Sequence, residues 1–370
     1  METPVYVTKP FLPPLAEFQE YLVDIWESRN LTNGAKYHQL LESQLAEYLG
    51  VKYISLFANA TLALISAIRS LHISGEVITT PFSFIATAHA LWWNGIKPVF
   101  VDIDPLTLDL DPDRIEAALT PKTTAILPVH VYGNPCNVVK IGEIAGRYGL
   151  RVIYDGAPAF GVTLEGKSVL SFGDLSVLSF HATKVFTTFE GGAIISHDAG
   201  MKKRIDNMKN FGFVTETSVV SPGINAKMNE LQAALGLLQL KYVDRAIALR
   251  KDVATRYRKK LEGVRGISML SDPPGAKGNS SYFPILVDEQ RYGSSRNALY
   301  EKLKARKIFA RRYYYPLISQ FPTYSGLESS LPGRMPVAEK AANEILCLPI
   351  YPDLDAATID FICGLIEGNE

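Results

Sequence analysis

The sequence predicts an α/β protein with a large domain, built on a doubly wound and mostly parallel or mixed sheet, and a smaller α+β domain. From residue 38 to about 200, short β-branched runs alternate with helical patterns, as they do when helices join parallel strands. A long helical stretch follows, and the pattern after it is different. A chain of 370 residues also exceeds the size at which a single hydrophobic core usually divides.

The large domain is predicted from elements that follow one another in a regular order. Helices are expected where apolar residues recur at helical spacing, at 38–49, 61–71, 83–93 and 138–148. Asp111 and Pro112, a cap followed by proline at the first helical position, predict another helix to about Leu119. Strands are expected at 53–57, 77–79, 98–101, 125–129, 151–155, 175–180 and 193–196. Such a sheet binds its ligands at the carboxyl ends of the strands.

The second domain follows a long helical pattern that runs from Ala226 to about Leu261. A helix of this length often bridges two domains. Beyond it, the sequence predicts a strand at 281–287, a helix at 294–306 and a last helix from Ala356. We therefore divide the chain inside the long helix, into a large domain with the N-terminal segment, 1–245, and a small C-terminal domain, 246–370.

Composition argues against several classes of partner and location. The 38 basic residues balance the 38 acidic ones, which argues against nucleic acid or an anionic membrane surface as a partner. No run of about 18 apolar residues occurs, so we expect no membrane span. The three scattered cysteines form neither a disulfide framework nor a zinc pattern, and the N-terminus lacks the features of a signal peptide. These features predict a cytoplasmic protein.

The sequence lacks the motifs of several common enzyme classes. It contains no dinucleotide-binding glycine pattern, no phosphate loop of nucleotide hydrolases, no zinc-protease motif and no serine nucleophile elbow. The six histidines show no metal-ligand spacing, so we predict no metal site. Hydride transfer, phosphoryl transfer and zinc-dependent hydrolysis therefore lose their usual sequence support.

One pair of residues indicates a different chemistry. The apolar strand 151–155 ends in Asp155, and Lys184 follows another buried strand and precedes Gly191 and Gly192. A lysine amine attacks an aldehyde to form an imine, and a carboxylate at a pyridine nitrogen keeps that ring protonated so that it accepts electrons. Taken singly, a strand-end Asp is more often a helix cap and a lone Lys is more often a surface charge. Together they favour a site for an aldehyde-bearing cofactor.

Two further segments suit such a cofactor. The segment 57–61 ends a strand and opens a helix, whose free N–H groups and positive dipole end attract phosphate. An asparagine cap on an ordinary helix is the alternative interpretation. Phe84 follows a proline turn and is placed to stack on a planar ring, although a core aromatic is the more common case.

At these residues the chain resembles the DegT/DnrJ/EryC1/StrS family of sugar aminotransferases. The most specific stretch is 179–184, Ser-Phe-His-Ala-Thr-Lys, with Glu-Gly-Gly at 190–192 and Asp155 upstream. The resemblance extends from Trp26 to Pro349 and implies an aspartate-aminotransferase-like fold, fold type I. It also implies pyridoxal 5′-phosphate as the cofactor and a homodimer with active sites shared between subunits.

The resemblance assigns roles to individual residues. Lys184 would be the Schiff-base lysine and proton shuttle, and Asp155 would contact the pyridine nitrogen. The remaining cofactor-binding residues would be Ala60, Thr61, Phe84, Ser179 and Asn225, the last reaching across from the other subunit. The residues expected to face the nucleotide-sugar are Thr32, Asn33, His181, Tyr313 and Tyr314.

One position departs from the family pattern. Members typically carry His or Gln three residues after the aspartate, where its side chain contacts the ring oxygen of the cofactor. This chain has Pro158, whose side chain cannot donate that hydrogen bond. We expect weaker control of the ring oxygen, with the lysine and aspartate in place.

Segments 9–14 and 184–190 resemble those of family members that aminate C-4 of the sugar. The function they imply is transfer of an amino group from L-glutamate to dTDP-4-keto-6-deoxyglucose, in O-antigen or lipopolysaccharide biosynthesis. The alternatives are a C-3 sugar aminotransferase, a dehydratase, in which histidine would replace Lys184, and a regulatory homologue without turnover. The shape of the sugar pocket decides between C-3 and C-4 and sets the nucleotide.

Overall fold

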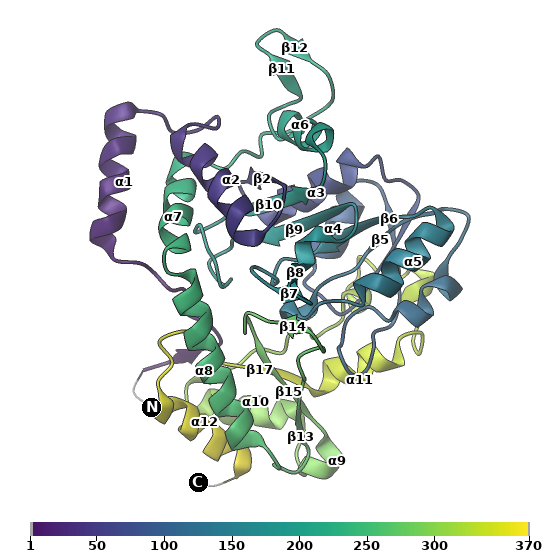
Figure 1. Ribbon diagram of the computed structural model, residues 1–370. Coiled ribbons are helices and arrows are strands. Elements are labelled where there is room, and N and C mark those ends of the chain that lie inside the picture. The colour runs from purple at the N-terminus through teal and green to yellow at the C-terminus, as the bar shows by residue number, and fades with distance from the viewer. Residues whose placement is uncertain (1–2, 369–370) are drawn as a thin grey trace.

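The computed structural model describes residues 3–368, and a seven-stranded sheet forms its centre (Figure 1). The strand order is β2-β10-β9-β6-β5-β3-β4, and β10 is the strand that runs antiparallel to its neighbours. The strands are β2 (Tyr53–Phe57), β3 (Glu76–Thr79), β4 (Lys97–Phe100), β5 (Thr123–Leu127), β6 (Arg151–Asp155), β9 (Leu175–Ser179) and β10 (Gly192–Ser196). The mostly parallel, mixed sheet that the sequence predicts is confirmed.

Helices cover both faces of this sheet because successive strand residues point to opposite sides. In β6, Val152 and Tyr154 pack in the core beneath α5, whereas Ile153 packs in the core beneath α3 and α4. Such strands are apolar on both faces, which is the pattern that predicted them. The helices of this part are α1 (Leu15–Ser28), α2 (Lys36–Leu49), α3 (Ala60–Ser70), α4 (Ala86–Trp93), α5 (Val138–Tyr148), α6 (Ala199–Met208) and α7 (Glu230–Leu240).

The C-terminal part contains a three-stranded antiparallel sheet of order β13-β15-β17, with helices packed on it. Its elements are α8 (Val243–Leu261), β13 (Ile267–Met269), β15 (Phe283–Val287), α9 (Glu289–Tyr292), α10 (Arg296–Ala305), α11 (Pro336–Glu344), β17 (Ile345–Leu348) and α12 (Ala356–Glu367). The smaller α+β part of the fold prediction therefore has its counterpart in the structure.

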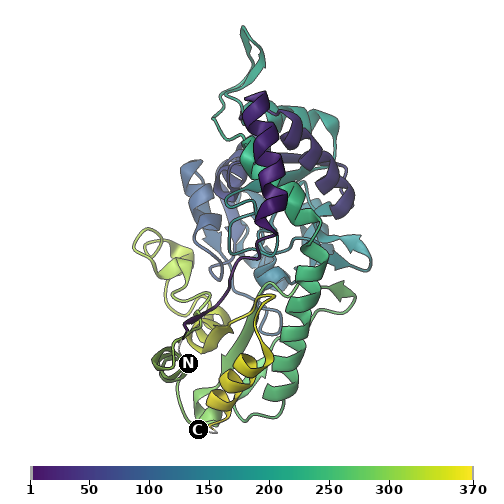
Figure 2. The ribbon, with the colours of Figure 1, turned by 90° about the vertical axis from the view of Figure 1, so that its left-hand side faces the viewer.

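Helix α8 links the two parts, as Figure 2 shows. Val243 at its start packs in the core beneath α2 and α7, whereas Tyr257 and Leu261 near its end pack in the core of the C-terminal sheet. The chain's beginning also joins the C-terminal part, because β1 (Val5–Tyr6) pairs in parallel with β16 (Ile308–Phe309). The division into 1–245 and 246–370 stays a prediction, and this strand pairing places the N-terminal segment with the second part.

Three sequence expectations about helices differ from the structure. The expected helix at 226–261 is two helices, α7 and α8, separated at Lys241 and Tyr242. The expected helix after Pro112 is two short 3₁₀ turns, Pro112–Arg114 and Glu116–Ala118, and the backbone is extended at Leu119. The expected helix at 83–93 begins three residues late, at Ala86. No element was expected at 15–28, where α1 lies.

Short hairpins complete the fold. The hairpin of β11 (Phe213–Thr215) and β12 (Ser218–Val219) projects from the molecule near α6 (Figure 1). A small sheet of β7 (Thr163–Leu164), β8 (Lys167–Ser168) and β14 (Ala276–Lys277) joins the large sheet region to the C-terminal part. Within residues 3–368, no helix is both long and apolar enough to cross a membrane, and no cluster of three or more His, Cys, Asp or Glu side chains suits a metal ion.

Candidate active site

A cavity of ≈ 630 Å³ opens at the carboxyl edge of the large sheet. Five parallel strands of the sheet, β2, β3, β5, β6 and β9, end at this edge, and each is followed by, or ends in, residues that line the cavity. The antiparallel β10 begins at the same edge, so Glu190 also lines the cavity. The site therefore lies where parallel α/β sheets bind their ligands.

Asp155 is the last residue of β6, and the residue is only 4% exposed. Two hydrogen bonds hold it: the Thr87 hydroxyl donates to Oδ2 at 2.8 Å, and the Ala157 N–H donates to Oδ1 at 3.1 Å. Burial raises the pKa of Asp155, while these two bonds and the nearby charge of Lys184 act in the opposite direction. A buried, oriented carboxylate of this kind is suited to share a proton with a basic ring nitrogen.

Lys184 approaches the same cavity from the loop between β9 and β10. Its side chain is partly buried, and its Nζ lies 3.3 Å from the hydroxyl oxygen of Tyr282. The loop is fixed from inside, because Phe186 is buried in an aromatic cluster with Phe160 and Phe180. The amine is thereby presented to the cavity that Asp155 also lines.

Helix α3 points its N-terminus into the cavity. Asn59 caps the helix through its side chain, which accepts from the Leu62 N–H at 2.9 Å, and Ala60 and Thr61 line the cavity. The first N–H groups of a helix have no partner within the helix and attract anions. Ser179, at the end of β9, adds a hydroxyl to the same cavity.

Gly192 is what allows α3 to start so close to the sheet. A Cβ at this position would lie 2.6 Å from the Ala60 nitrogen, a contact that side chains do not make. A Cβ on Gly191 would collide with the Thr188 hydroxyl, at 2.1 Å. Gly192 therefore makes room for the N-terminus of α3.

Aromatic side chains border the rest of the cavity. Phe84 is 62% exposed, so it is not the core aromatic that was the alternative interpretation. Tyr313 and Tyr314 come from the C-terminal part of the chain, and Tyr132 packs parallel to Tyr314 with the ring centroids 5.9 Å apart. His181 is half exposed and lies beside Thr183, whose hydroxyl is 2.8 Å from its Nδ1.

The structure brings together nine of the twelve site residues expected from the sequence. Those that line the cavity are Ala60, Thr61, Phe84, Asp155, Ser179, His181, Lys184, Tyr313 and Tyr314. Thr32, Asn33 and Asn225 do not line it and are exposed on other loops. The roles of all twelve residues stay predictions. The positions of Thr32, Asn33 and Asn225 do not support a role in the cavity of their own chain.

Several residues that line the cavity were not among the expected site residues, and Thr87 and Tyr282 are the two that contact Asp155 and Lys184. Thr87 lies within a segment that was expected to be helical, just after β3, so the rule of strand carboxyl ends offered a signal for it. Tyr282 offered none, because its contact with Lys184 joins residues 98 positions apart. Pro158, noted as a departure, does line the cavity.

The donor set fits pyridoxal 5′-phosphate group by group. The phosphate matches the terminus of α3 and Ser179, the pyridine nitrogen matches the Asp155 carboxylate, and the aldehyde matches the Lys184 amine. All of these groups border one cavity. The ring oxygen has no donor at Pro158.

Comparison with known proteins gives the same family along nearly the whole chain. Residues 15–367 match the model of the DegT/DnrJ/EryC1/StrS aminotransferase family. The dTDP-4-amino-4,6-dideoxy-D-glucose transaminase of Shigella dysenteriae is 52% identical over 368 residues, which is 99% of each chain. The transaminase of the same name from Escherichia coli is 50% identical over 364 residues, 98% of each chain.

Solved structures agree with this. The crystal structure of DesI in the presence of its TDP-sugar product matches with a TM-score of 0.95 at 34% identity, covering 99% of this chain and 93% of that one. The match confirms the expected fold type I architecture. The chain therefore belongs to the DegT/DnrJ/EryC1/StrS aminotransferase family, whose enzymes depend on pyridoxal 5′-phosphate.

Proposed function

We propose that this protein transfers the amino group of L-glutamate to the C-4 keto group of dTDP-4-keto-6-deoxyglucose, giving dTDP-4-amino-4,6-dideoxyglucose. The observation that carries the proposal is the shared cavity of Lys184, Asp155 and the α3 terminus in a chain half identical to transaminases named for that product. Nearly complete coverage of both relatives supports carrying the reaction over to this chain.

Different residues of the cavity would bind the phosphate and the ring nitrogen of the cofactor. The N–H groups at Ala60 and Thr61, with the Ser179 hydroxyl, would bind the phosphate and fix the position of the ring. Asp155, oriented by Thr87, would hold a proton at the ring nitrogen. The bound, protonated ring supplies the electron sink of the reaction.

Lys184 would carry out the proton transfers to and from the substrates. Its amine would take a proton from the α-carbon of glutamate and, in the second half of the reaction, deliver one to C-4 of the sugar. His181, Tyr313 and Tyr314 lie on the cavity wall and would contact the substrate there. Closing the cavity with a large sugar nucleotide excludes water from the amine.

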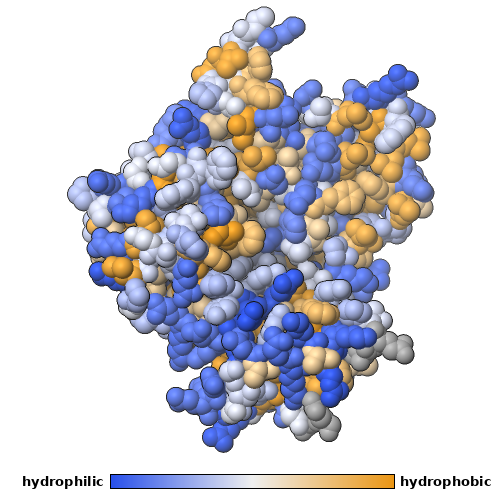
Figure 3. All heavy atoms as spheres, turned by 180° about the vertical axis from the view of Figure 1, so that it is seen from behind, coloured by the Kyte–Doolittle hydropathy of each residue, from blue (hydrophilic) through white to orange (hydrophobic). Residues whose placement is uncertain are grey.

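We propose that the enzyme works as a homodimer with shared sites. Thr32, Asn33 and Asn225 lie on exposed loops outside the cavity of their own chain, which suits residues that serve the cavity of a second chain. Helix α1 carries large exposed apolar side chains, and Figure 3 shows hydrophobic residues gathered on the face of the molecule that the N-terminal helices help to form. Those on α1 are Leu15, Val23 and Trp26.

We further propose a cytoplasmic enzyme whose product enters O-antigen or lipopolysaccharide. The three cysteines are unpaired and buried, as suits a reducing compartment. Deleting the gene in its host should remove the amino sugar from the surface polysaccharide, as carbohydrate analysis of that polysaccharide would show. An unchanged sugar composition would contradict this placement.

The test of the reaction uses the purified protein loaded with pyridoxal 5′-phosphate. It is incubated with L-glutamate and either dTDP-4-keto-6-deoxyglucose or its 3-keto isomer, with the Lys184→Ala variant as control. We expect 2-oxoglutarate and an amino sugar from the 4-keto substrate, identified by mass spectrometry and located at C-4 by NMR. Failure to find an amino sugar from the 4-keto substrate would contradict the proposal, and product from the 3-keto isomer alone would show a C-3 enzyme.

A further inference from the structure

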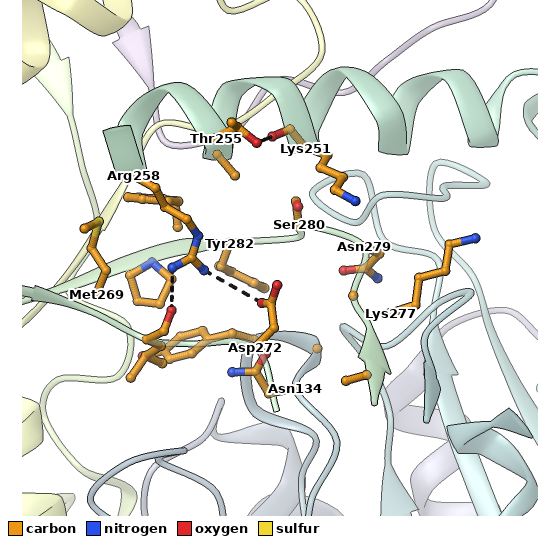
Figure 4. A pocket seen from close by; sticks show the side chains of 18 residues that line it. Asn134, Lys251, Thr255, Arg258, Met269, Asp272, Lys277, Asn279, Ser280 and Tyr282 are labelled. Atoms are coloured by element: carbon orange, nitrogen blue, oxygen red, sulfur yellow. Dashed lines mark hydrogen bonds and ion pairs between the residues drawn. The ribbon is translucent and has the colours of Figure 1, made fainter. Parts of the chain in front are cut away.

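Tyr282 separates the active-site cavity from a second cavity. The second one, of ≈ 300 Å³, lies between α8, the loop after β5 and the segment that leads into β15 (Figure 4). Among the residues that line either cavity, Tyr282 is the one common to both. Figure 4 shows the Tyr282 side chain among the residues that line the second cavity. Tyr282 therefore lies in the wall between the two cavities.

The ring of Tyr282 is held by two other tyrosines. The ring centroid of Tyr132 lies 5.6 Å away, and that of Tyr313 lies 5.9 Å away with its plane nearly perpendicular, at 85°. Edge-to-face contacts of this kind are favourable and restrict the rotation of the side chain. Tyr132 is itself buried, so the cluster is anchored in the interior.

The backbone just before Tyr282 is tied to Pro158. The side-chain N–H of Asn279 donates to the Pro158 carbonyl at 2.8 Å, and the Ser281 hydroxyl donates to the same oxygen at 2.9 Å. Ser280 between them has a φ of 51°, a left-handed conformation that turns the chain so that both neighbours reach this oxygen. The segment that carries Tyr282, just before β15, is thus fixed to the segment that departs from the family pattern.

The hydroxyl of Tyr282 faces the amine of Lys184. The Nζ–Oη distance is 3.3 Å, and the Nζ lies 5.7 Å from the centre of the ring. Lysine has a long, flexible side chain, so an amine without a fixed neighbour samples many directions. A hydroxyl on a rigid ring selects one of them.

We propose that Tyr282 is a positioning residue that aims the Lys184 amine at the reacting carbon. The inference rests on the proposed function, because it needs Lys184 to be the reactive amine. The hydroxyl accepts one N–H of the amine and so directs the lone pair into the active-site cavity. Efficient proton transfer and attack on an aldehyde both require that alignment.

The experiment compares Tyr282→Phe with wild type. Phenylalanine keeps the ring and its aromatic neighbours and removes the hydroxyl alone. The matched control is Tyr53→Phe, because Lys52 also lies over the Tyr53 ring, at 5.3 Å, on a strand end away from the cavity. Thermal melting of all three proteins checks that they remain folded to the same extent.

The first readout needs no substrate. The cofactor-free protein is mixed with pyridoxal 5′-phosphate, and the rate at which the cofactor becomes trappable on Lys184 by borohydride is measured. We expect Tyr282→Phe to slow this capture by about tenfold, since misdirected reacting groups commonly lose one to two orders of magnitude. The second readout is steady-state kinetics, where kcat should fall about 10- to 100-fold while the KM of glutamate and of the keto-sugar stays within about twofold. Tyr53→Phe should match wild type in both.

The outcomes separate this inference from the proposed function. If wild type captures the cofactor on Lys184 and Tyr282→Phe does so equally fast with an unchanged kcat, the positioning role is wrong and the function stands. A rise in KM with unchanged kcat would also overturn it, because it would make Tyr282 a substrate-binding residue. Failure of wild type itself to form the adduct at Lys184 would contradict the proposed function instead.

Discussion

The predicted site has two regions that are built differently. Asp155 and Ser179, in the cofactor region, end neighbouring buried strands and are largely buried themselves. Thr32, Asn33 and Asn225, expected in the substrate region and at the subunit boundary, lie on exposed loops outside the cavity. If the predicted roles hold, the difference teaches that the chain builds the chemistry on a rigid sheet edge and leaves part of the substrate recognition to loops.

The exposed loops are nevertheless anchored. The buried carboxylate of Glu230 accepts the backbone N–H of Tyr37 at 2.7 Å and of His38 at 3.3 Å, at the start of α2. The Glu230 N–H donates to the carbonyl of Leu31 at 3.0 Å. The loop with Thr32 and Asn33 is thus held between the starts of two helices, α2 and α7.

The largest effect is expected at Lys184, in the cofactor region. Lys184→Ala should lower kcat by about 10⁴-fold, because it removes both the nucleophile and the proton-transfer group. The kcat of Lys184→Arg should fall by as much, although arginine keeps the positive charge. A guanidinium neither condenses with an aldehyde nor gives up a proton readily. Kinetics of amino-sugar formation measure both. Substantial activity in the arginine variant would show that charge, and not amine chemistry, matters at this position.

Asp155→Asn is expected to have the next largest effect and to act in opposite directions on activity and stability. Asparagine can keep the contacts with Thr87 and Ala157 but not the charge, so kcat should fall about 10²- to 10³-fold. Because burial raises the pKa of Asp155 in the folded protein, the cofactor-free wild type should lose stability as the pH rises through that pKa. The variant lacks this loss.

Melting temperatures of the two cofactor-free proteins, measured as a function of pH, test this. The asparagine variant should become the more stable one toward neutral pH, and the gap should close at acidic pH. Asp174→Asn is a matched control, since Asp174 accepts the N–H of Val152 near the amino-terminal edge of the strands, outside the cavity. Parallel melting curves for wild type and Asp155→Asn would contradict the assigned pKa direction.

A subunit-mixing experiment tests the loop region directly. Lys184→Ala and Asn225→Ala chains should each be weakly active, but a mixture unfolded and refolded together should recover about a quarter of wild-type activity. Random pairing makes half of the dimers hybrids, and each hybrid holds one site without either change, provided that Asn225 serves the partner's cavity. Activity per chain before and after mixing measures the recovery. If Asn225 served its own chain, mixing would recover nothing.

The same two regions show how far the sequence predicts the structure. The strands 53–57 and 151–155 and the helix 138–148 agree with the structure to the residue, because local apolar patterns and caps define them. The residues at the strand ends follow from the topology, so Asp155, Lys184 and Ala60 were placed at one edge by rule alone.

What the sequence could not predict depends on contacts between distant residues. The break between α7 and α8 falls in a continuous apolar pattern, and both residues at the break, Lys241 and Tyr242, contact Glu17 of α1. Helix α7 starts at Glu230 because Asn229 and Gln232 form a capping box there. The apolar pattern alone had predicted a start at Ala226. Tyr282 reached the site in the same way, through tertiary packing.

The smallest effect is expected at Pro158, where the cofactor region departs from its family. Pro158→Gln restores a donor near the ring oxygen, and one neutral hydrogen bond is worth about 1 kcal/mol, or about fivefold in the dissociation constant of pyridoxal 5′-phosphate. The carbonyl that binds Asn279 and Ser281 belongs to the backbone and remains available in the variant. Removing a proline also frees the unfolded chain, which should lower the free energy of unfolding by about 0.4–1 kcal/mol.

Pro158→Ala separates these two effects, because alanine loses the ring constraint and adds no donor. Equilibrium dialysis should show tighter cofactor binding for Pro158→Gln than for wild type, and unchanged cofactor binding for Pro158→Ala. Both variants should melt slightly below wild type. If alanine bound the cofactor as tightly as glutamine, the gain would come from backbone freedom and not from the ring oxygen. Pro158 would then provide a rigid backbone in place of a hydrogen bond to the ring oxygen. The site, with Asp155 and Lys184 already fixed at the sheet edge, would not require that hydrogen bond.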